Sequence, residues 1–116
     1  MCTNFKHRPA KDGTVVVGRT MEFPIGIPWQ LQVLPKDTHF SALIPGGRSW
    51  TSTYGIVGIA AVADTVVMDG MNEAGVSGHG LYMAGFCTYQ DPKGDGKDLS
   101  EADVIAYLLA TCGSIE

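Results

Sequence analysis

Glycine and proline divide most of this chain into short segments, and this spacing limits which folds are open to it. The 116 residues include 15 glycines and 6 prolines, and neither residue is well tolerated inside a helix. Up to residue 97 the stretches between them are short and rich in β-branched and apolar residues, which is typical of strands joined by turns. The sequence therefore predicts a series of short strands, with one helix after residue 97.

A hairpin is predicted at the start of the chain. The β-prone runs 2–7 and 14–19 flank a segment in which Pro9 and the pair Asp12-Gly13 supply turn residues. These two runs are expected to pair antiparallel. Their pairing would bring the residues around Arg19 beside the beginning of the chain.

Further strands are predicted in the middle of the chain. Residues 30–34 and 50–61 are apolar runs bounded by turn residues, and the second run is expected to be a buried strand. A second hairpin follows, in which residues 65–70 and 76–83 flank a five-residue connection that ends at Gly75. Glycine can take the positive φ that such a tight connection often requires.

One helix is predicted near the end of the chain. Ser100 followed by Asp103 is a helix-start pattern, and apolar side chains at positions 104, 105, 108 and 109 form a stripe that must be buried. A single helix cannot cover both faces of a sheet of about six strands. The expectation is an α+β domain with one sheet face and one edge uncovered, in a chain that is cut short.

Composition and charge exclude several classes of protein. Twelve acidic and eight basic side chains give a net charge of −4, and no cluster of lysine and arginine could neutralise a run of phosphates, so neither nucleic acid nor an anionic membrane surface is an expected partner. The longest apolar stretches, 56–63 and 104–110, are far shorter than the roughly 20 residues needed to cross a bilayer. The first six residues lack the pattern of a signal peptide, which predicts a cytoplasmic protein.

The cysteines and histidines do not form a metal-binding pattern. Cys2, Cys87 and Cys112 include no CxxC pair and fit neither a disulfide framework nor a zinc site. His39 and His79 have no second histidine, cysteine or carboxylate at metal-ligand spacing. No metal site is expected, and Cys87 and Cys112 are expected to pack as small apolar residues.

Cys2 is a candidate nucleophile because of its position. Methionine is readily removed before a small residue, and its removal would leave a free α-amino group on the residue that carries the thiol. The reference pKa is about 7.7–8.0 for the amine and about 8.5 for the thiol, so at neutral pH both groups need help to react. The alternative is that position 2 holds an ordinary small thiol.

Arg19 and Glu22 are the charged residues that hairpin pairing brings toward Cys2. A turn about residues 10–11 places Cys2 opposite Arg19, whereas a turn nearer 12–13 places Glu22 or Phe23 opposite it. A cation about 4 Å from the sulfur would interact with it by up to about 4 kcal/mol at an effective dielectric constant of 20. Such an interaction would lower the pKa of both the thiol and the amine.

Glu22 is the candidate anionic partner of this site. Its carboxylate could hold the α-ammonium or Arg19 in place. Strand alternation would point positions 19 and 22 to opposite faces, so a bend between them is required. The alternative is that Arg19 and Glu22 form a surface ion pair worth at most about 1 kcal/mol.

The polar residues around the second hairpin have two interpretations. Asp69, Asn72 and Glu73 could belong to an active site. Their place around a tight connection makes a turn-forming role about three times as favoured. We therefore expect them to shape the turn.

Five short segments occur in the order and spacing of a known family. They are Met-Cys-Thr at 1–3, Gly-Arg-Thr-Met-Glu-Phe at 18–23, Trp-Thr-Ser-Thr-Tyr-Gly at 50–55, Asp-Gly-Met-Asn-Glu-Ala-Gly at 69–75 and Gly-Leu-Tyr at 80–82. Together they resemble the choloylglycine hydrolase family, which includes penicillin V acylases and conjugated bile-salt hydrolases, over essentially the whole chain. The resemblance implies an N-terminal-nucleophile hydrolase of αββα architecture. Residues 1–116 would be the N-terminal portion of that domain, with its strands and one helix.

The resemblance also implies roles for four residues. Cys2 would be the nucleophile, with its own α-amine as proton acceptor and donor, in an enzyme that cleaves linear amide bonds through an acyl-cysteine. Arg19 would lie against the sulfur, and Glu22 would stand near the amine, where the family usually has Asp. Tyr82 would lie beside the nucleophile and donate its backbone N–H to the oxyanion. No cofactor is implied.

Two departures from the family pattern affect the expected activity. Glu22 is one methylene longer than Asp, which on a scale of about 1 Å could misplace the amine. Family members are longer than this chain and supply a further oxyanion Asn and an Arg from later positions. Losing one oxyanion donor typically lowers turnover by roughly 10²–10³. The alternative interpretation is therefore a truncated, catalytically inactive remnant that keeps part of the sheet.

The expected substrate is an acylated small molecule. In the resembled family, tyrosine at the position of Tyr82 is more typical of penicillin V acylase-like members, and asparagine of bile-salt hydrolases. Met21, Phe23, Trp29 and Met83 could line an apolar acyl pocket, and each is equally well explained as core. Phenoxyacyl amides, bile-acid conjugates and N-acyl homoserine lactones all stay open. The resemblance also implies a homo-oligomer, such as the tetramer of full-length relatives.

Overall fold

The computed structural model describes residues 2–9, 11–23, 25–60, 65–83 and 85–116. Its elements are β1 (Thr3–Lys6), β2 (Val17–Thr20), β3 (Gln30–Leu34), β4 (His39–Ser41), β5 (Ser49–Thr51), β6 (Ile56–Ala60), β7 (Val67–Asn72), β8 (Ser77–His79) and α1 (Val104–Thr111). They form two compact units. We call residues 1–26 with 81–88 the hairpin unit, and residues 27–80 with 89–116 the sheet unit. The α+β class expected from the sequence is confirmed.

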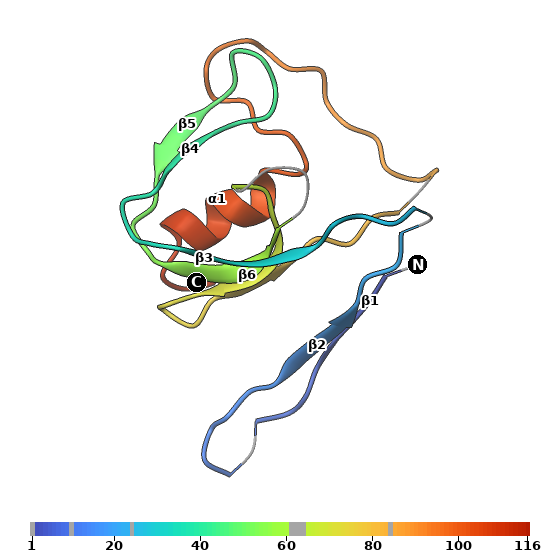
Figure 1. The fold of residues 1–116 in the computed structure, drawn as a ribbon, viewed down its shortest axis with the longest axis vertical. Helices are drawn as coiled ribbons and strands as arrows, with labels where there is room; N and C mark the ends of the chain where they lie inside the picture. The colour runs from blue at the N-terminus through green and yellow to red at the C-terminus, as the bar shows by residue number, and fades with distance from the viewer. Residues whose placement is uncertain (1, 10, 24, 61–64, 84) are drawn as a thin grey trace. The chain divides into compact units, whose positions relative to one another are not determined.

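Four antiparallel strands form the main sheet of the sheet unit, in the order β3, β6, β7, β8 (Figure 1). α1 packs on one face of this sheet, against β7 and β8. The strands β4 and β5 form a separate antiparallel pair. β4 has no counterpart among the strands predicted from the sequence.

A row of three glycines lets α1 approach the sheet closely. Gly58 lies opposite Gly70, and Gly70 lies opposite Gly78, so the three share one face. A Cβ added to Gly70 would lie 3.2 Å from a Leu109 methyl, and one added to Gly78 would lie 3.1 Å from an Ile105 methyl. Without side chains at these positions, Ile105 and Leu109 rest on bare backbone, and Leu109 is completely buried. Val104 and Leu108, the other two residues of the predicted stripe, are instead exposed.

Aromatic rings extend this core from the helix to the β4–β5 pair. Phe40 and Trp50 stack with their ring centres 5.2 Å apart, and Tyr107 of α1 meets Trp50 edge-on at 5.4 Å. The guanidinium of Arg48 lies 4.9 Å from the centre of the Tyr107 ring. These contacts bury the inward faces of β4 and β5, in which Phe40 and Trp50 are the buried residues.

The buried side chain of Asn72 ties the β7–β8 connection to the end of the helix. Its amide nitrogen donates to the Leu109 carbonyl at 2.9 Å and to the Cys112 carbonyl at 2.8 Å. Its oxygen accepts the N–H groups of Ala74 at 3.1 Å and Val76 at 3.0 Å. The amide thus satisfies backbone groups that the helix end and the turn would otherwise leave unpaired.

The helix begins where the sequence predicts, although not through the expected cap. Ser100 is not the N-cap; Asp103 occupies that position and its side chain makes no capping bond to the helix. The buried Asp103 carboxylate accepts the Ser100 hydroxyl at 2.8 Å and the Leu43 N–H at 3.1 Å. Asp103 therefore fixes a loop to the helix start. No helix in the described ranges is long and apolar enough to span a membrane.

The predicted strand 50–61 is two strands rather than one. β5 ends at Thr51 and β6 begins at Ile56, while Ala61 lies outside the described residues. The break occurs because the N–H groups of Thr53 and Tyr54 donate to the Ala110 carbonyl of the helix, at 2.7 and 3.3 Å. A strand cannot continue through residues whose N–H groups are used in this way.

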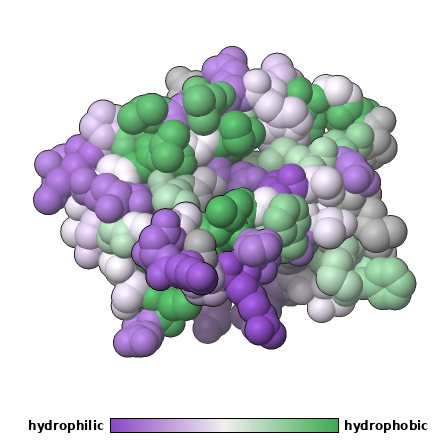
Figure 2. Space-filling view, turned by 90° about the horizontal axis from the view of Figure 1, so that it is seen from below, coloured by the Kyte–Doolittle hydropathy of each residue, from purple (hydrophilic) through white to green (hydrophobic). Residues whose placement is uncertain are grey.

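The sheet face opposite α1 carries exposed apolar side chains. Leu31 and Val33 on β3 are 72% and 74% exposed, and Val57 and Met71 are also exposed. The register places Val33 opposite Val57 and Val57 opposite Met71, so these side chains lie together. Figure 2 shows hydrophobic side chains reaching the surface between hydrophilic ones.

The glycine row yields a stability prediction. We expect Gly70→Ala to lower the free energy of unfolding by about 2–3 kcal/mol, because the added methyl overpacks the helix interface; it would lie 2.7 Å from the Val57 carbonyl oxygen. Gly55→Ala is the matched control, since its Cβ would meet no atom closer than 3.8 Å. Urea unfolding followed by far-UV circular dichroism measures both. Equal midpoints would contradict the proposed role of the glycine row.

Candidate active site

The first hairpin pairs in a different register from the one expected. β1 and β2 are antiparallel, with Thr3 opposite Thr20 and Asn4 opposite Arg19. Continued by one residue, this register brings Met21 opposite Cys2. Neither expected register, with Arg19 or with Glu22 or Phe23 opposite Cys2, is therefore the one observed. The Thr3 N–H also donates to the Thr20 hydroxyl at 3.1 Å, which fixes the end of the ladder next to Cys2.

The position of the turn explains this shift. The carboxylate of Asp12 accepts the Thr14 N–H at 2.9 Å, which is a turn formed by an Asp side chain. The His7 N–H donates to the Val16 carbonyl at 2.8 Å, so pairing continues beyond β1 toward that turn. The turn is thus centred later than residues 10–11, of which Ala10 lies outside the described residues.

Several groups converge on the sulfur of Cys2, which is half-buried, and lower its pKa. The largest contribution is a hydrogen bond from the Glu22 backbone N–H. Burial of the sulfur opposes this effect by raising the pKa. The pKa is lowered further by a hydrogen bond from the Tyr82 backbone N–H, by the charge of Arg19 and by the α-ammonium of the chain. The hairpin unit therefore brings together Cys2, Arg19, Glu22 and Tyr82.

The positive charge of the α-ammonium at the start of the chain lowers the pKa of Glu22. The pKa of its exposed carboxyl is lowered first by a hydrogen bond from the α-ammonium and then by the charge of that group. β2 ends at Thr20, so strand alternation does not govern Glu22, and the expected conflict between positions 19 and 22 does not arise. Met1 lies outside the described residues, and its removal stays a prediction.

Tyr82 contributes its backbone rather than its side chain. The Tyr82 side chain is 58% exposed, and the residue lies in an irregular segment after β8. Among the predicted pocket residues of the hairpin unit, Met21 and Phe23 are half-buried and Met83 is 62% exposed. Trp29 belongs to the sheet unit. The acyl pocket stays a prediction.

The sequence reasoning missed a hydrogen-bonded pair formed by Asp69 and His79. These residues lie opposite each other on β7 and β8, and the Asp69 carboxylate is hydrogen-bonded to Nδ1 of His79. Their side chains are only 14% and 17% exposed. The signal was present in the second hairpin, because a turn centred on residue 74 pairs positions 69 and 79.

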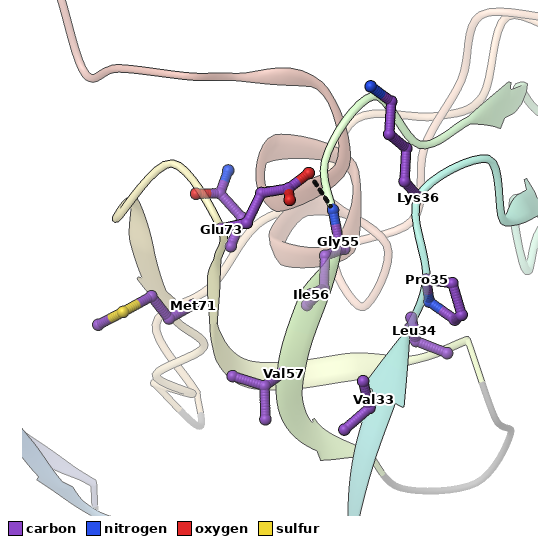
Figure 3. A pocket seen from close by; sticks show the side chains of 10 residues that line it. Val33, Leu34, Pro35, Lys36, Gly55, Ile56, Val57, Met71 and Glu73 are labelled. Carbon is purple, nitrogen blue, oxygen red and sulfur yellow. Dashed lines mark hydrogen bonds between the residues drawn. The ribbon is translucent and has the colours of Figure 1, made fainter.

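Of the other polar residues of the second hairpin, Asn72 shapes the turn as expected, whereas Glu73 ties it to Gly55. Asn72 binds the backbone of the connection, and the Glu73 carboxylate accepts the Gly55 N–H at 3.0 Å (Figure 3). Glu73 also borders a groove of about 410 Å³, whose apolar wall includes Val33 and Val57. The described part of the chain has no group of three or more His, Cys, Asp or Glu side chains that could hold a metal ion.

Comparison with known proteins places this geometry in context. The family described as linear amide C–N hydrolases, choloylglycine hydrolase family, matches residues 2–116. The solved structure of penicillin V acylase from Agrobacterium tumefaciens is similar, with 28% sequence identity and a TM-score of 0.82. The match covers 99% of this chain and 35% of that structure's chain. This chain therefore spans about a third of the length of that relative.

The environment of Cys2 yields a pH prediction. Because its pKa is lowered, the Cys2 thiol deprotonates at lower pH than an ordinary thiol, and its alkylation by iodoacetamide should level off at lower pH. Cys87 is exposed, so the expectation that it packs as a small apolar residue is wrong, and it serves as a reference in the same molecule. Peptide mass spectrometry at a series of pH values from 5 to 10 measures the alkylation rates of Cys2 and Cys87 separately. Identical pH midpoints for Cys2 and Cys87 would show that Cys2 is an ordinary thiol.

Proposed function

Because this chain belongs to the choloylglycine hydrolase family of linear amide C–N hydrolases, we propose that it carries the nucleophile of an amidohydrolase, Cys2. The observation that carries the proposal is the convergence on one sulfur of the Glu22 N–H, the Tyr82 N–H and the charge of Arg19. All of these groups stabilise a thiolate, which is the reactive form of cysteine. A buried structural thiol would not require them.

The proposed reaction begins after Met1 is removed. The free α-amine of Cys2 takes the thiol proton, and the thiolate attacks the carbonyl carbon of the substrate amide. The resulting ammonium then gives its proton to the leaving nitrogen as the C–N bond breaks, which leaves an acyl-cysteine and a free amine. Water, deprotonated by the same α-amine, hydrolyses the acyl-cysteine and regenerates the thiol.

Three residues support this sequence of steps. The Tyr82 N–H donates to the sulfur, and in the proposed reaction it would donate to the oxyanion that forms on the attacked carbonyl. The charge of Arg19 favours the thiolate. The Glu22 carboxylate accepts a hydrogen bond from the α-ammonium of the untrimmed chain, and after removal of Met1 it would hold the amine of Cys2 in place through the proton transfers.

The proposed substrate class is an acylated small molecule, with a phenoxyacyl amide tested first. The similar solved structure is that of a penicillin V acylase, and the tyrosine at position 82 favours the same group. A catalytically inactive chain is the second candidate, because the chain spans 35% of the length of that relative. Further oxyanion donors of the family would come from the remaining length.

The nucleophile assignment is tested by substitution. We expect Cys2→Ala to lower hydrolysis of penicillin V by at least about 10³-fold, since the proposed acyl intermediate forms on the Cys2 sulfur. Cys87→Ala is the matched control and should stay within about twofold of the parent, as expected for an exposed surface position. Glycocholate serves as the second substrate, and the assay is run on this chain and, if the gene allows, on a longer product that extends to full family length.

Each outcome of this assay has a distinct meaning. Retained activity in Cys2→Ala would rule out the proposed mechanism. Turnover by the longer product alone would mean that residues 1–116 carry the nucleophile and not the whole site. The absence of turnover in both, with Met1 removed and both substrates tested, would favour the inactive chain.

The role of Glu22 gives a second prediction, on pH dependence. The ammonium of the untrimmed chain lowers the pKa of Glu22. In the proposed site the Glu22 carboxylate would likewise stabilise the ammonium form of the Cys2 amine after Met1 is removed. In Glu22→Gln the amine pKa should fall, which moves the acidic limb of the kcat/KM profile to lower pH. The maximum should also fall by about 10-fold, because the amine is less well placed. Glu22→Asp keeps the charge and should keep the limb; an unmoved limb in Glu22→Gln would contradict the assignment.

A further inference from the structure

The last pair of the β1–β2 ladder lies next to the candidate nucleophile. Thr3 and Thr20 form this pair, and Cys2 directly precedes β1 in the chain. All three residues belong to the hairpin unit. The ends of a ladder fray unless a further contact holds them. The position of Cys2 relative to β2 therefore depends on how firmly the Thr3–Thr20 pair is held.

A side-chain hydroxyl reinforces this last pair. The Thr20 hydroxyl accepts the Thr3 N–H at 3.1 Å, and this N–H belongs to the peptide bond that joins Cys2 to Thr3. A peptide bond is planar, and its plane contains the Cα atoms of both residues. Because Thr3 is also held in β1, this plane is fixed at its N–H and at the strand. The Cα of Cys2, which carries the thiol and the amine, is thereby held beside Thr20.

The same hydroxyl also reaches the carboxylate of Glu22. A hydroxyl can donate one hydrogen bond while it accepts another. The α-ammonium makes the largest contribution to lowering the pKa of Glu22, and a hydrogen bond with the Thr20 side chain lowers that pKa further. β2 ends at Thr20, so the ladder itself does not hold Glu22. One hydroxyl thus connects the peptide bond after Cys2 to the carboxylate two residues beyond the hydroxyl.

We propose that Thr20 is a positioning residue whose hydroxyl holds the backbone of Cys2 and the carboxylate of Glu22 at fixed positions relative to each other. Thr20 acts through these two residues and contacts no reacting atom. A displacement of about 1 Å between a proton donor and its acceptor is enough to slow a catalytic step. The inference rests on the proposed role of Cys2 as the nucleophile.

The test compares the reactivity of Cys2 in variants of Thr20 and needs no turnover. Thr20→Val removes the hydroxyl and keeps the branched shape and the strand preference of the side chain. Cys2 is then free to move away from the Glu22 N–H, so the pH midpoint of Cys2 alkylation should rise by about 0.5 relative to that of Cys87. Thr20→Ser keeps the hydroxyl and should keep the parent midpoint.

Thr3→Val is the matched control for this comparison. It removes a hydroxyl from the same ladder pair but leaves the Thr3 N–H and its acceptor in place. The Cys2 midpoint should therefore stay at the parent value. This control separates the loss of the hydrogen bond from a general effect of a Thr-to-Val change at the end of the hairpin.

Three results would overturn the proposal. They are an unchanged Cys2 midpoint in Thr20→Val with far-UV circular dichroism showing a folded chain, equal midpoints in the Val and Ser variants, and an equal shift in Thr3→Val. If Thr20→Val fails to fold, Thr20→Ala replaces it, because it also lacks the hydroxyl and adds no atom. Activity of Cys2→Ala would refute the nucleophile and leave the alkylation result standing, so the two failures are distinguishable.

Discussion

Asn72 makes four hydrogen bonds from a buried side chain, and the arrangement of the sheet unit depends on them. Two bonds run to carbonyls near the end of α1 and two to N–H groups of the β7–β8 connection. They fix the turn, and the turn fixes the register of β8. That register places Gly78 under the helix and His79 opposite Asp69. One amide therefore couples the packing of the helix to the register of β8.

The candidate active site uses backbone groups as much as side chains. The hydrogen bonds to the Cys2 sulfur come from the N–H groups of Glu22 and Tyr82, which every residue except proline could supply. The side chains that the site requires by chemistry are the thiol of Cys2, the cation of Arg19 and the carboxylate of Glu22. The geometry of the site therefore depends on the backbone path at the end of the hairpin and in the segment after β8, rather than on many specific side chains.

Much of the fold could be predicted from local patterns. Glycine and proline marked the turns, the stripe at 104–109 marked the helix, and the connection at 71–75 marked the second hairpin, all of which the structure contains. The errors arose where distant groups compete for backbone hydrogen bonds. The run 50–61 has the composition of one strand, but the helix carbonyl of Ala110 takes the N–H groups of Thr53 and Tyr54. No local sequence pattern indicates that a distant carbonyl will accept these N–H groups.

The sequence by itself determined that Cys2, Arg19 and Glu22 would lie near one another, because any turn close to residues 10–13 brings position 2 beside positions 19–22. Only the tertiary structure decided which of them face the sulfur, since the Asp12 side chain moves the turn and shifts the pairing by two residues. The same holds for Asp69 and His79, which are ten residues apart and joined by the register of a turn. Register is set by hydrogen bonds formed together across the fold, and a shift of one residue turns every side chain to the other face.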